Sequence, residues 1–248
     1  MTVKRIKRSI TPVFQAGKQK GDFMNSSGKK GNQKSRVGIH TNVKDESLVE
    51  KRRQQICKAA LQAFTQNGFH ETNLRQITNL AGLAYGSIYD YVKTKNDILF
   101  LIYDSILGEL YHRLEEAAKS SEDPIEQMRA LIYAAMDHTD EYQDAIILLY
   151  QESRVMKTSG HLSEVFEKER SYLRIFDEVL QRGVRQGVFR IRSPQVLENI
   201  LPMMTSAWAL KRWNLRKISR EEFTRTLIEF MLQGIGVSDA SRYGVASR

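Results

Sequence analysis

The chain has 248 residues, with 38 Lys/Arg, 29 Asp/Glu and a single cysteine, Cys57. One cysteine excludes an intrachain disulfide and favours a reducing compartment. The longest purely apolar run, Ala145–Tyr150, is far shorter than the roughly 18 residues that a membrane span needs. The N-terminus is basic but lacks the apolar stretch of a secretory signal. These features predict a soluble, cytoplasmic protein.

The net charge of +9 is concentrated at the N-terminus. Residues 1–44 hold eleven Lys/Arg and one acid, Asp22, a net charge of +10, so residues 45–248 are nearly neutral. This segment is polar, has no apolar period and cannot offset its ordering entropy by burial, which predicts a disordered tail. Two interpretations stay open: a basic arm that binds nucleic acid, and a solvated extension, including a start codon assigned upstream of Met24.

From Asp45 onward the apolar residues follow a helical period, and strand-like alternation is absent. Ser47–Glu50 reads Ser-x-x-Glu, a capping box that predicts the start of a first helix. Gly68 predicts its end. Between them an apolar stripe at helical spacing indicates a core-facing side, formed by Ile56, Ala60, Ala63 and Phe64.

Two short helices are expected next. Thr72 or Asn73 caps the second helix, which Gly82 ends. The third helix spans Tyr85 to Val92, and Asp97 caps a long fourth helix. Two short helices joined by a tight turn have the geometry of a helix-turn-helix.

The third expected helix is unusually rich in tyrosine. In a helix-turn-helix the second short helix enters the major groove, and its N-terminal residues reach base edges. Ile88 and Val92 supply an apolar side for docking, and Gly86 lets the backbone come close to DNA. The alternative for Tyr89 and Tyr91 is that they are core aromatics, but consecutive odd positions spread around a helix. Hydroxyls and cations for DNA then come from Tyr85, Ser87, Tyr89, Tyr91, Lys93 and Lys95.

Leu74–Phe100, preceded by Lys51–Phe69, resembles the tetracycline-repressor (TetR) family of transcriptional regulators. The resemblance rests on Ala-Gly-aliphatic, then Gly-x-aliphatic-Tyr-x-Tyr, then Lys-x-Lys before a new helix. It implies that Arg75 reads a base edge or a phosphate and that Asn73 caps and clamps. It places Tyr85, Gly86 and Ser87 at the tip in the major groove, and gives phosphate contacts to Tyr89, Tyr91 and Lys95.

Three positions depart from the family pattern. Ala84 stands where a capping Ser is usual, at a cost of about 1 kcal/mol. Val92 replaces the usual Phe and thins the small core. Asp90 puts an acid on the DNA-reading helix, where it either accepts from cytosine N4 or points away from DNA.

Further helices are expected at 124–142, 143–157, 161–187, 194–217 and 219–234. Pro202 is expected to kink the fourth of these. The last two helices are expected to form an isologous dimer contact, through Leu227, Ile228, Phe230, Met231 and Leu232.

Polar aromatics and methionines in this region suit a mostly apolar pocket with a few polar contacts, although at helical spacing they also suit a core. Two interpretations of Trp208–Arg216 stay open: a positively charged binding site for an anionic ligand, and a basic helix end that lies at a dimer interface or compensates the helix dipole. Together with Leu148–Met156 it resembles segments of family members tied to fatty-acid and acyl-CoA metabolism. The candidate ligand-binding residues are Tyr103, Tyr133, Tyr150, Met204, Trp208 and Arg212.

No motif points to catalysis. The five histidines are scattered, and His-Glu-x-x-His, a phosphate-binding glycine loop and Gly-x-Ser-x-Gly are all missing from the sequence. We therefore expect no enzyme, no metal and no cofactor.

The sequence thus predicts an all-α protein with three parts: a disordered basic tail at 1–44, a helix-turn-helix DNA-binding domain at 45–96, and a helical ligand-binding and dimerisation domain at 97–248. The expected function is sequence-specific DNA binding by a homodimer. It would act as a repressor that a small molecule, with acyl-CoA as the candidate, releases from a palindromic operator. The alternative is a ligand-independent architectural DNA-binding protein that uses the basic tail.

Overall fold

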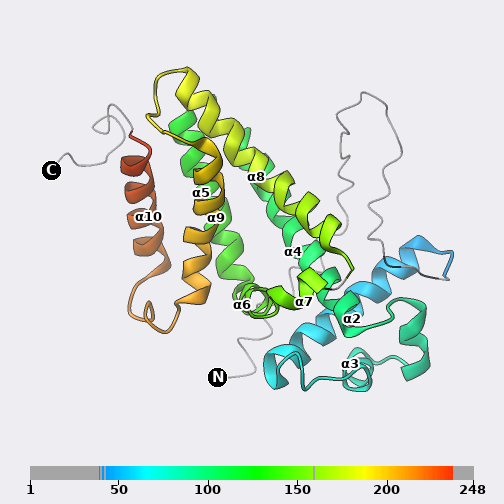
Figure 1. The fold of residues 1–248 in the computed structure, drawn as a ribbon. Coiled ribbons are helices and arrows are strands. Elements are labelled where there is room, and N and C mark those ends of the chain that lie inside the picture. Colours follow the sequence, from blue (N-terminus) through cyan, green and yellow to red (C-terminus); the bar gives the residue numbers. More distant parts are fainter. Residues whose placement is uncertain (1–38, 40, 42, 159, 237–248) are drawn as a thin grey trace. The chain divides into compact units, whose positions relative to one another are not determined.

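Every regular element in the described part of the chain is a helix, which confirms the all-α prediction (Figure 1). The computed structural model describes residues 39, 41, 43–158 and 160–236. Apart from residues 39, 41, 43 and 44, the predicted basic tail lies outside these residues. No helix within the described ranges is long and apolar enough to cross a membrane.

The chain divides into two compact units. Unit 1 comprises residues 1–105 and 148–165, and unit 2 comprises residues 106–147 and 166–248. The divisions fall inside three helices, α4 (Lys95–Ala118), α6 (Gln143–Gln151) and α8 (Leu162–Arg185). Each of these helices therefore contributes to both units. The domain boundary that the sequence places between residues 96 and 97 stays a prediction.

Helix α2 (Glu46–Asn67) opens unit 1. Its N-cap is Asp45, whose carboxylate accepts from the backbone N–H groups of Ser47 and Leu48. The prediction that Ser47 caps the helix was wrong. The cap is Asp45, and the Ser47 hydroxyl donates a hydrogen bond to the Asp45 carboxylate at 2.7 Å. The predicted end is confirmed, since Gly68 takes a left-handed φ of 87° and its N–H donates to Phe64 O.

Helix α3 (Leu74–Ala81) and the 3₁₀ helix η1 (Tyr85–Asp90) form the expected pair of short helices. Asn73 and Gln76 cap α3 reciprocally, and Gly82 ends it in the left-handed conformation, as predicted. The third element is a tight 3₁₀ helix rather than the expected α-helix to Val92. Ala84 supplies no side-chain cap, and both the N–H and the hydroxyl of Ser87 donate to Ala84 O, which favours the tighter turn.

Helix α4 begins two residues before its expected cap. Thr94 Oγ1 accepts from the N–H of Asp97, and the Asp97 carboxylate accepts from the N–H groups of Lys93 and Thr94. This is a capping box in which Asp97 is the third helical residue and Thr94 the cap. The expectation that Asp97 is the cap itself is corrected accordingly.

The remaining helices follow the expected order with different ends. Helices α5 (Pro124–Glu141) and α10 (Arg220–Gly234) agree closely with the sequence, and α7 (Ser153–Thr158) is separate from α6. Helix α9 (Pro194–Leu210) contains Pro202, as expected, but stops short of residue 217. Residues 211–217 carry four cations, including the pair Arg212 and Arg216 at a spacing of four, and such like-charge pairs destabilise a helix.

The core of unit 2 is drawn from the second half of α4 and from α5, α8, α9 and α10. Helices α5 and α9 lie side by side in Figure 1 and contact each other. Four of the five α10 residues expected at a dimer contact are instead buried in this core: Leu227, Ile228, Met231 and Leu232. Only Phe230 is exposed.

Candidate nucleic-acid interface

Three side chains from α3 and η1 form an exposed group, which we call the Arg75 cluster: Arg75, Tyr85 and Tyr89. Tyr85 and Tyr89 are 44% and 46% exposed. Their hydroxyls lie 2.9 Å apart, and their rings meet edge to face. The Arg75 guanidinium lies 5.6 Å from the centroid of the Tyr85 ring. The cluster therefore offers a planar five-donor cation and two hydroxyls at one exposed site.

Gly86 lies between these tyrosines without a structural reason to be glycine. Its φ is not positive, and a Cβ placed on it would have no atom within 4 Å. The fold of the chain thus tolerates a side chain here, whereas a closely approaching partner would not. By contrast, the polar groups of Ser87 and Asn73 are used locally, in the turn at Ala84 and in the cap of α3.

Tyr91 does not lie on the exposed side. It is only 7% exposed and, with Ile88 and Val92, belongs to the buried side of the element. This burial favours the alternative that Tyr91 is a core aromatic over a phosphate contact. Tyr91 directly follows η1, so helical spacing does not fix the direction of its side chain.

The ammonium group of Lys95 is engaged inside unit 1. Nζ donates to the carbonyls of Phe69 and His70, at 2.7 and 2.9 Å, and lies over the Phe69 ring. Burial lowers the pKa of Lys95. Two of its three N–H donors thus connect the start of α4 with the turn after α2, which gives it a structural role. Lys93, in contrast, is exposed.

Residues 148–165, although distant in sequence, also belong to unit 1. His161 stacks on Phe100 with ring centroids 4.3 Å apart, and its Nε2 lies 3.4 Å from Asp97 Oδ1. His70 Nε2 lies 3.2 Å from Glu152 Oε2. Residues 148–165 therefore contact the capping box of α4 and the turn after α2. Sequence reasoning missed these pairs because 64 residues separate Asp97 from His161.

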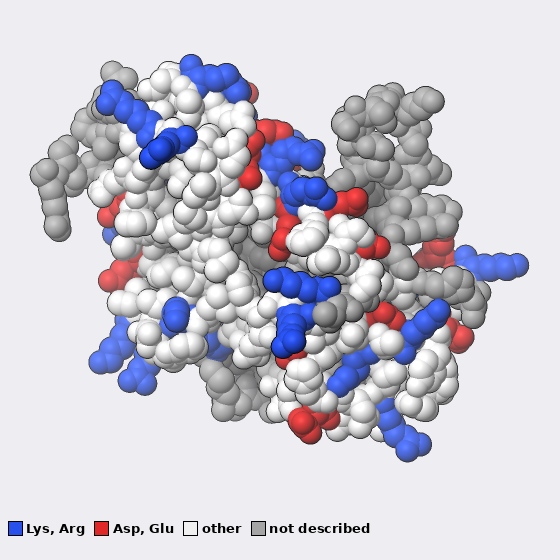
Figure 2. All heavy atoms as spheres, in the orientation of Figure 1, with Lys and Arg blue, Asp and Glu red and all other residues white. Residues whose placement is uncertain are grey.

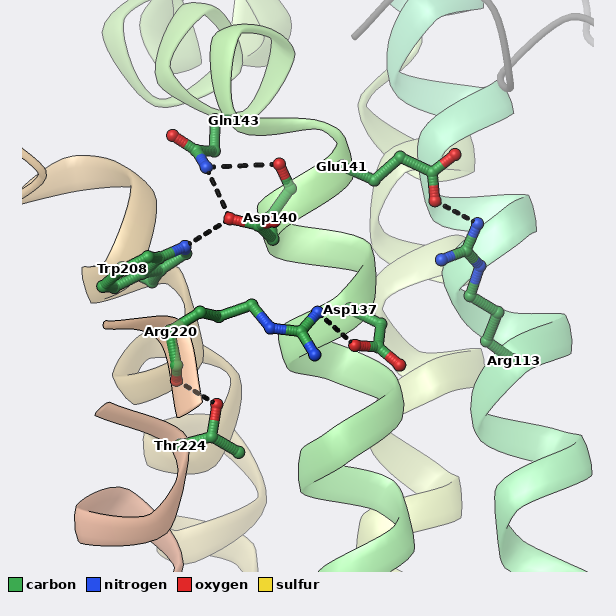
Figure 3. Close-up of polar contacts among 8 residues, drawn as sticks. All are labelled: Arg113, Asp137, Asp140, Glu141, Gln143, Trp208, Arg220 and Thr224. Atoms are coloured by element: carbon green, nitrogen blue, oxygen red, sulfur yellow. Dashed lines mark hydrogen bonds and ion pairs between the residues drawn. The ribbon is translucent and has the colours of Figure 1, made fainter. Parts of the chain in front are cut away.

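The polar groups of two ligand candidates lie against carboxylates, Trp208 against Asp140 of α5 (Figure 3) and Arg212 against Asp144 of α6. Trp208 Nε1 donates to Asp140 Oδ1 at 2.7 Å, and Arg212 Nη1 lies 3.1 Å from Asp144 Oδ1. A further pair joins Arg220 to Asp137, at 2.5 Å. The Asp144 carboxylate thus pairs with the Arg212 guanidinium within the protein, and the interpretation of Trp208–Arg216 as a binding site for an anionic ligand stays a prediction.

The other ligand candidates are divided between the units. Tyr103 and Tyr150 belong to unit 1, and Tyr133 and Met204 to unit 2. Tyr133 and Tyr150 are exposed, Tyr103 is partly buried, and Met204 packs against the unit 2 core.

The sequence did not predict the burial of a histidine in unit 2. His138 is almost fully buried, and its Nε2–H donates to Ile106 O at 3.0 Å. Its ring contacts Tyr142, and burial, with a smaller contribution from the Arg113 charge, lowers its pKa to about 3. Arg113 is itself paired with Glu109 and also with Glu141, the second pair being drawn in Figure 3. His138 is therefore neutral in the folded protein at neutral pH.

Basic and acidic side chains are interspersed on the face drawn in Figure 2. This agrees with the near-neutral charge of residues 45–248. Among the residues with a described placement, no group of three or more His, Cys, Asp or Glu could hold a metal ion.

Two helices in helix-turn-helix order, with exposed Arg and Tyr side chains, define a DNA-binding regulator. Residues 56–102 match the family described as bacterial regulatory proteins, tetR family, and residues 121–235 match the tetracyclin repressor-like C-terminal domain. The chain belongs to the tetracycline-repressor family of transcriptional regulators. Members of this family bind DNA, act as dimers and bind small-molecule effectors.

Individual relatives agree with this assignment. The HTH-type transcriptional regulator HbdR of Aromatoleum sp. (strain CIB) is 27% identical over 179 residues, which cover 72% of this chain and 78% of the relative. The fatty acid metabolism regulator protein of Bacillus subtilis (strain 168) is 24% identical, over 73% and 94% of the two chains. The ketosteroid transcriptional regulator KstR2 of Mycobacterium tuberculosis shares the fold, with a TM-score of 0.61 and 20% identity over 74% and 94% of the two chains.

Proposed function

We propose that this protein is a repressor that binds a near-palindromic operator as a dimer and leaves it when unit 2 binds an amphipathic anion. The observation that carries the DNA-binding part is the Arg75 cluster. An arginine and two tyrosines stay exposed on a helix-turn-helix and contact one another there.

The roles at DNA follow from the chemistry of each group. Arg75 reads a base edge or a phosphate, since a guanidinium can bond guanine O6 and N7 together. Tyr85 and Gly86 lie at the tip of the element, where glycine permits close approach. Tyr89 and Lys93 bind phosphates, which fix register without reading sequence.

The dimer contact that we propose runs along α9. Val196, Ile200 and Met203 recur at i, i+4 and i+7 and are all exposed, so they form an apolar stripe. Phe230 of α10 is 63% exposed. Two copies of this surface, related by a two-fold axis, would bury these side chains in an isologous contact.

Ile200→Glu tests the dimer contact. A carboxylate buried at a two-fold axis meets its own copy, so we expect a monomer at micromolar concentration in sedimentation and loss of operator binding of more than about tenfold. Val184→Glu on α8 is the matched control, because Val184 is also an exposed aliphatic residue. A dimer that persists in Ile200→Glu contradicts the α9 contact and leaves the DNA-binding roles unaffected.

For the effector we propose a long-chain acyl-CoA. The support is the aromatic and methionine-rich composition of unit 2 and the likeness to a fatty acid metabolism regulator. Release requires that the ligand bind the DNA-free state more tightly than the DNA-bound state.

Titration of the operator complex with palmitoyl-CoA tests this proposal, with coenzyme A and palmitate alone as controls. We expect palmitoyl-CoA to lower operator affinity at least tenfold and the two controls to have little effect. Binding of palmitoyl-CoA without a change in operator affinity, or no binding, contradicts the effector. Release by a steroid acid instead would move the effector to another class of amphipathic anion.

A further inference from the structure

The residues just before α2 are held against the end of η1. Thr41 Oγ1 donates to Asp90 O at 2.6 Å. Arg53, on α2, donates through Nη2 to Ile39 O at 2.6 Å and through Nε to Tyr91 O at 3.2 Å. The Ile39 side chain is buried. Direct and arginine-mediated bonds thus join residues 39 and 41 to residues 90 and 91, and we call this set of contacts the anchor.

The anchor is not needed to begin α2. Asp45 already caps that helix through its own carboxylate. Arg53 is partly buried, and this burial lowers the pKa of its guanidinium. A planar guanidinium has N–H groups at fixed angles, which suits it to bridge two carbonyls on separate segments. The anchor therefore determines where the preceding chain starts relative to η1.

The preceding chain is strongly basic. Residues 1–38 contain ten Lys/Arg and one acid, Asp22. Its starting point lies beside Asp90 and Tyr91, directly after the Tyr85 and Tyr89 pair. When the origin of an arm is fixed, the effective concentration of its cations is high at phosphates near that origin and low at distant phosphates.

We propose that the anchor makes residues 1–38 an arm that binds the phosphates of duplex DNA next to each half-site, at a fixed offset from η1. This inference rests on the proposed function, because it requires that η1 face DNA. The arm would lengthen the DNA site without reading additional bases, since phosphate contacts carry no sequence information. An unanchored tail of the same charge would instead attract any duplex.

Four full-length chains test the proposal: wild type, a tail-neutral variant with all ten Lys/Arg of residues 1–38 changed to Gln, Thr41→Val and Arg53→Gln. Thr65→Val is the matched control, because Thr65 Oγ1 makes a similar bond to Leu61 O within α2. The DNA probes are the duplex that wild type selects from random sequence, trimmed to its half-sites, and the same duplex with about 15 bp of arbitrary flank on each side. Thermal unfolding verifies that each variant is folded.

We expect wild type to prefer the flanked duplex about tenfold at low salt and the tail-neutral variant to bind both duplexes equally. The slope of log K against log salt should fall by a few units in the tail-neutral variant, at about 0.9 per lost phosphate contact. In hydroxyl-radical footprints, wild type and Thr65→Val should protect the same discrete backbone positions in the flanks. Thr41→Val and Arg53→Gln should keep the salt slope but spread or lose that protection.

Equal preference for the flanked duplex in wild type and the tail-neutral variant overturns the arm. Unchanged discrete flank protection in both Thr41→Val and Arg53→Gln overturns the anchor. The proposed function fails separately, if the tail-neutral variant cannot distinguish the trimmed duplex from a scrambled one.

Discussion

Two pairs of aromatic side chains, one in each unit, serve opposite purposes. In unit 1, Tyr85 and Tyr89 are exposed, and their hydroxyls lie within hydrogen-bond distance of each other. In unit 2, His138 and Tyr142 are buried against one another, and the histidine donates to a backbone carbonyl. Substituting an exposed pair should change the stability of the fold little, and such a pair is accessible to a partner. A buried pair ties protonation to stability.

The largest expected effect is the loss of stability at low pH that comes from the buried His138. His138 has a pKa of about 3 when folded and an ordinary value of 6.5. Between these values the unfolded state binds more protons, so stability falls as pH falls below about 6.5. At pH 4.5 the loss from this residue should be about 2–3 kcal/mol relative to pH 7.

Urea unfolding of wild type and His138→Gln at pH 7 and pH 4.5 measures this loss. The glutamine amide can still donate to Ile106 O, so the variant should lack this part of the acid destabilisation. His112→Gln, at an exposed histidine, should behave like wild type. The same pH dependence in all three chains would mean that folding does not lower the pKa of His138.

The second prediction concerns the exposed side. Arg75→Ala should weaken operator binding by about 1–3 kcal/mol and relax base preference at one position of each half-site, because a base contact is lost. Unfolding should be unchanged. The control is Arg225→Ala, an exposed arginine of α10, and equal operator affinity in the two variants would remove Arg75 from the interface.

The smallest effect separates two tyrosines that differ in burial. Tyr89→Phe removes an exposed hydroxyl and should cost about 0.5–1.5 kcal/mol of DNA binding, uniformly across sequences. Tyr91→Phe should leave DNA binding unchanged, since that ring belongs to the buried side. Binding by fluorescence anisotropy at one salt concentration measures both. If only Tyr91→Phe lost DNA affinity, Tyr91 and not Tyr89 would be the tyrosine that contacts DNA.

Local signals in the sequence predicted much of unit 1. Asn73 as a cap and Gly68 and Gly82 as stops follow from backbone chemistry that any context preserves. The 3₁₀ form of η1 and the burial of Tyr91 did not follow. They depend on how the end of η1 packs, and helical spacing ceases to apply where the helix ends.

Contacts between distant residues account for the rest. Lys95 resembles a phosphate ligand in sequence, but its ammonium group bonds carbonyls 25 and 26 residues away. Arg212 resembles part of an anion site, but Asp144, 68 residues away, neutralises it. A sequence shows that a cation is present, whereas only the fold shows whether its charge is already paired.

The central claim is that the Arg75 cluster reads DNA sequence on behalf of a dimer. Its most direct test is selection of bound duplexes from a random pool by wild type and by Arg75→Ala, at a salt concentration that suppresses non-specific binding. We predict that wild type enriches a near-palindrome with half-site centres about 10 bp, or a multiple of this, apart. Arg75→Ala should lose preference at a symmetric pair of positions within it. Enrichment of no sequence by wild type, or of the same sequence with equal stringency by Arg75→Ala, would contradict the account.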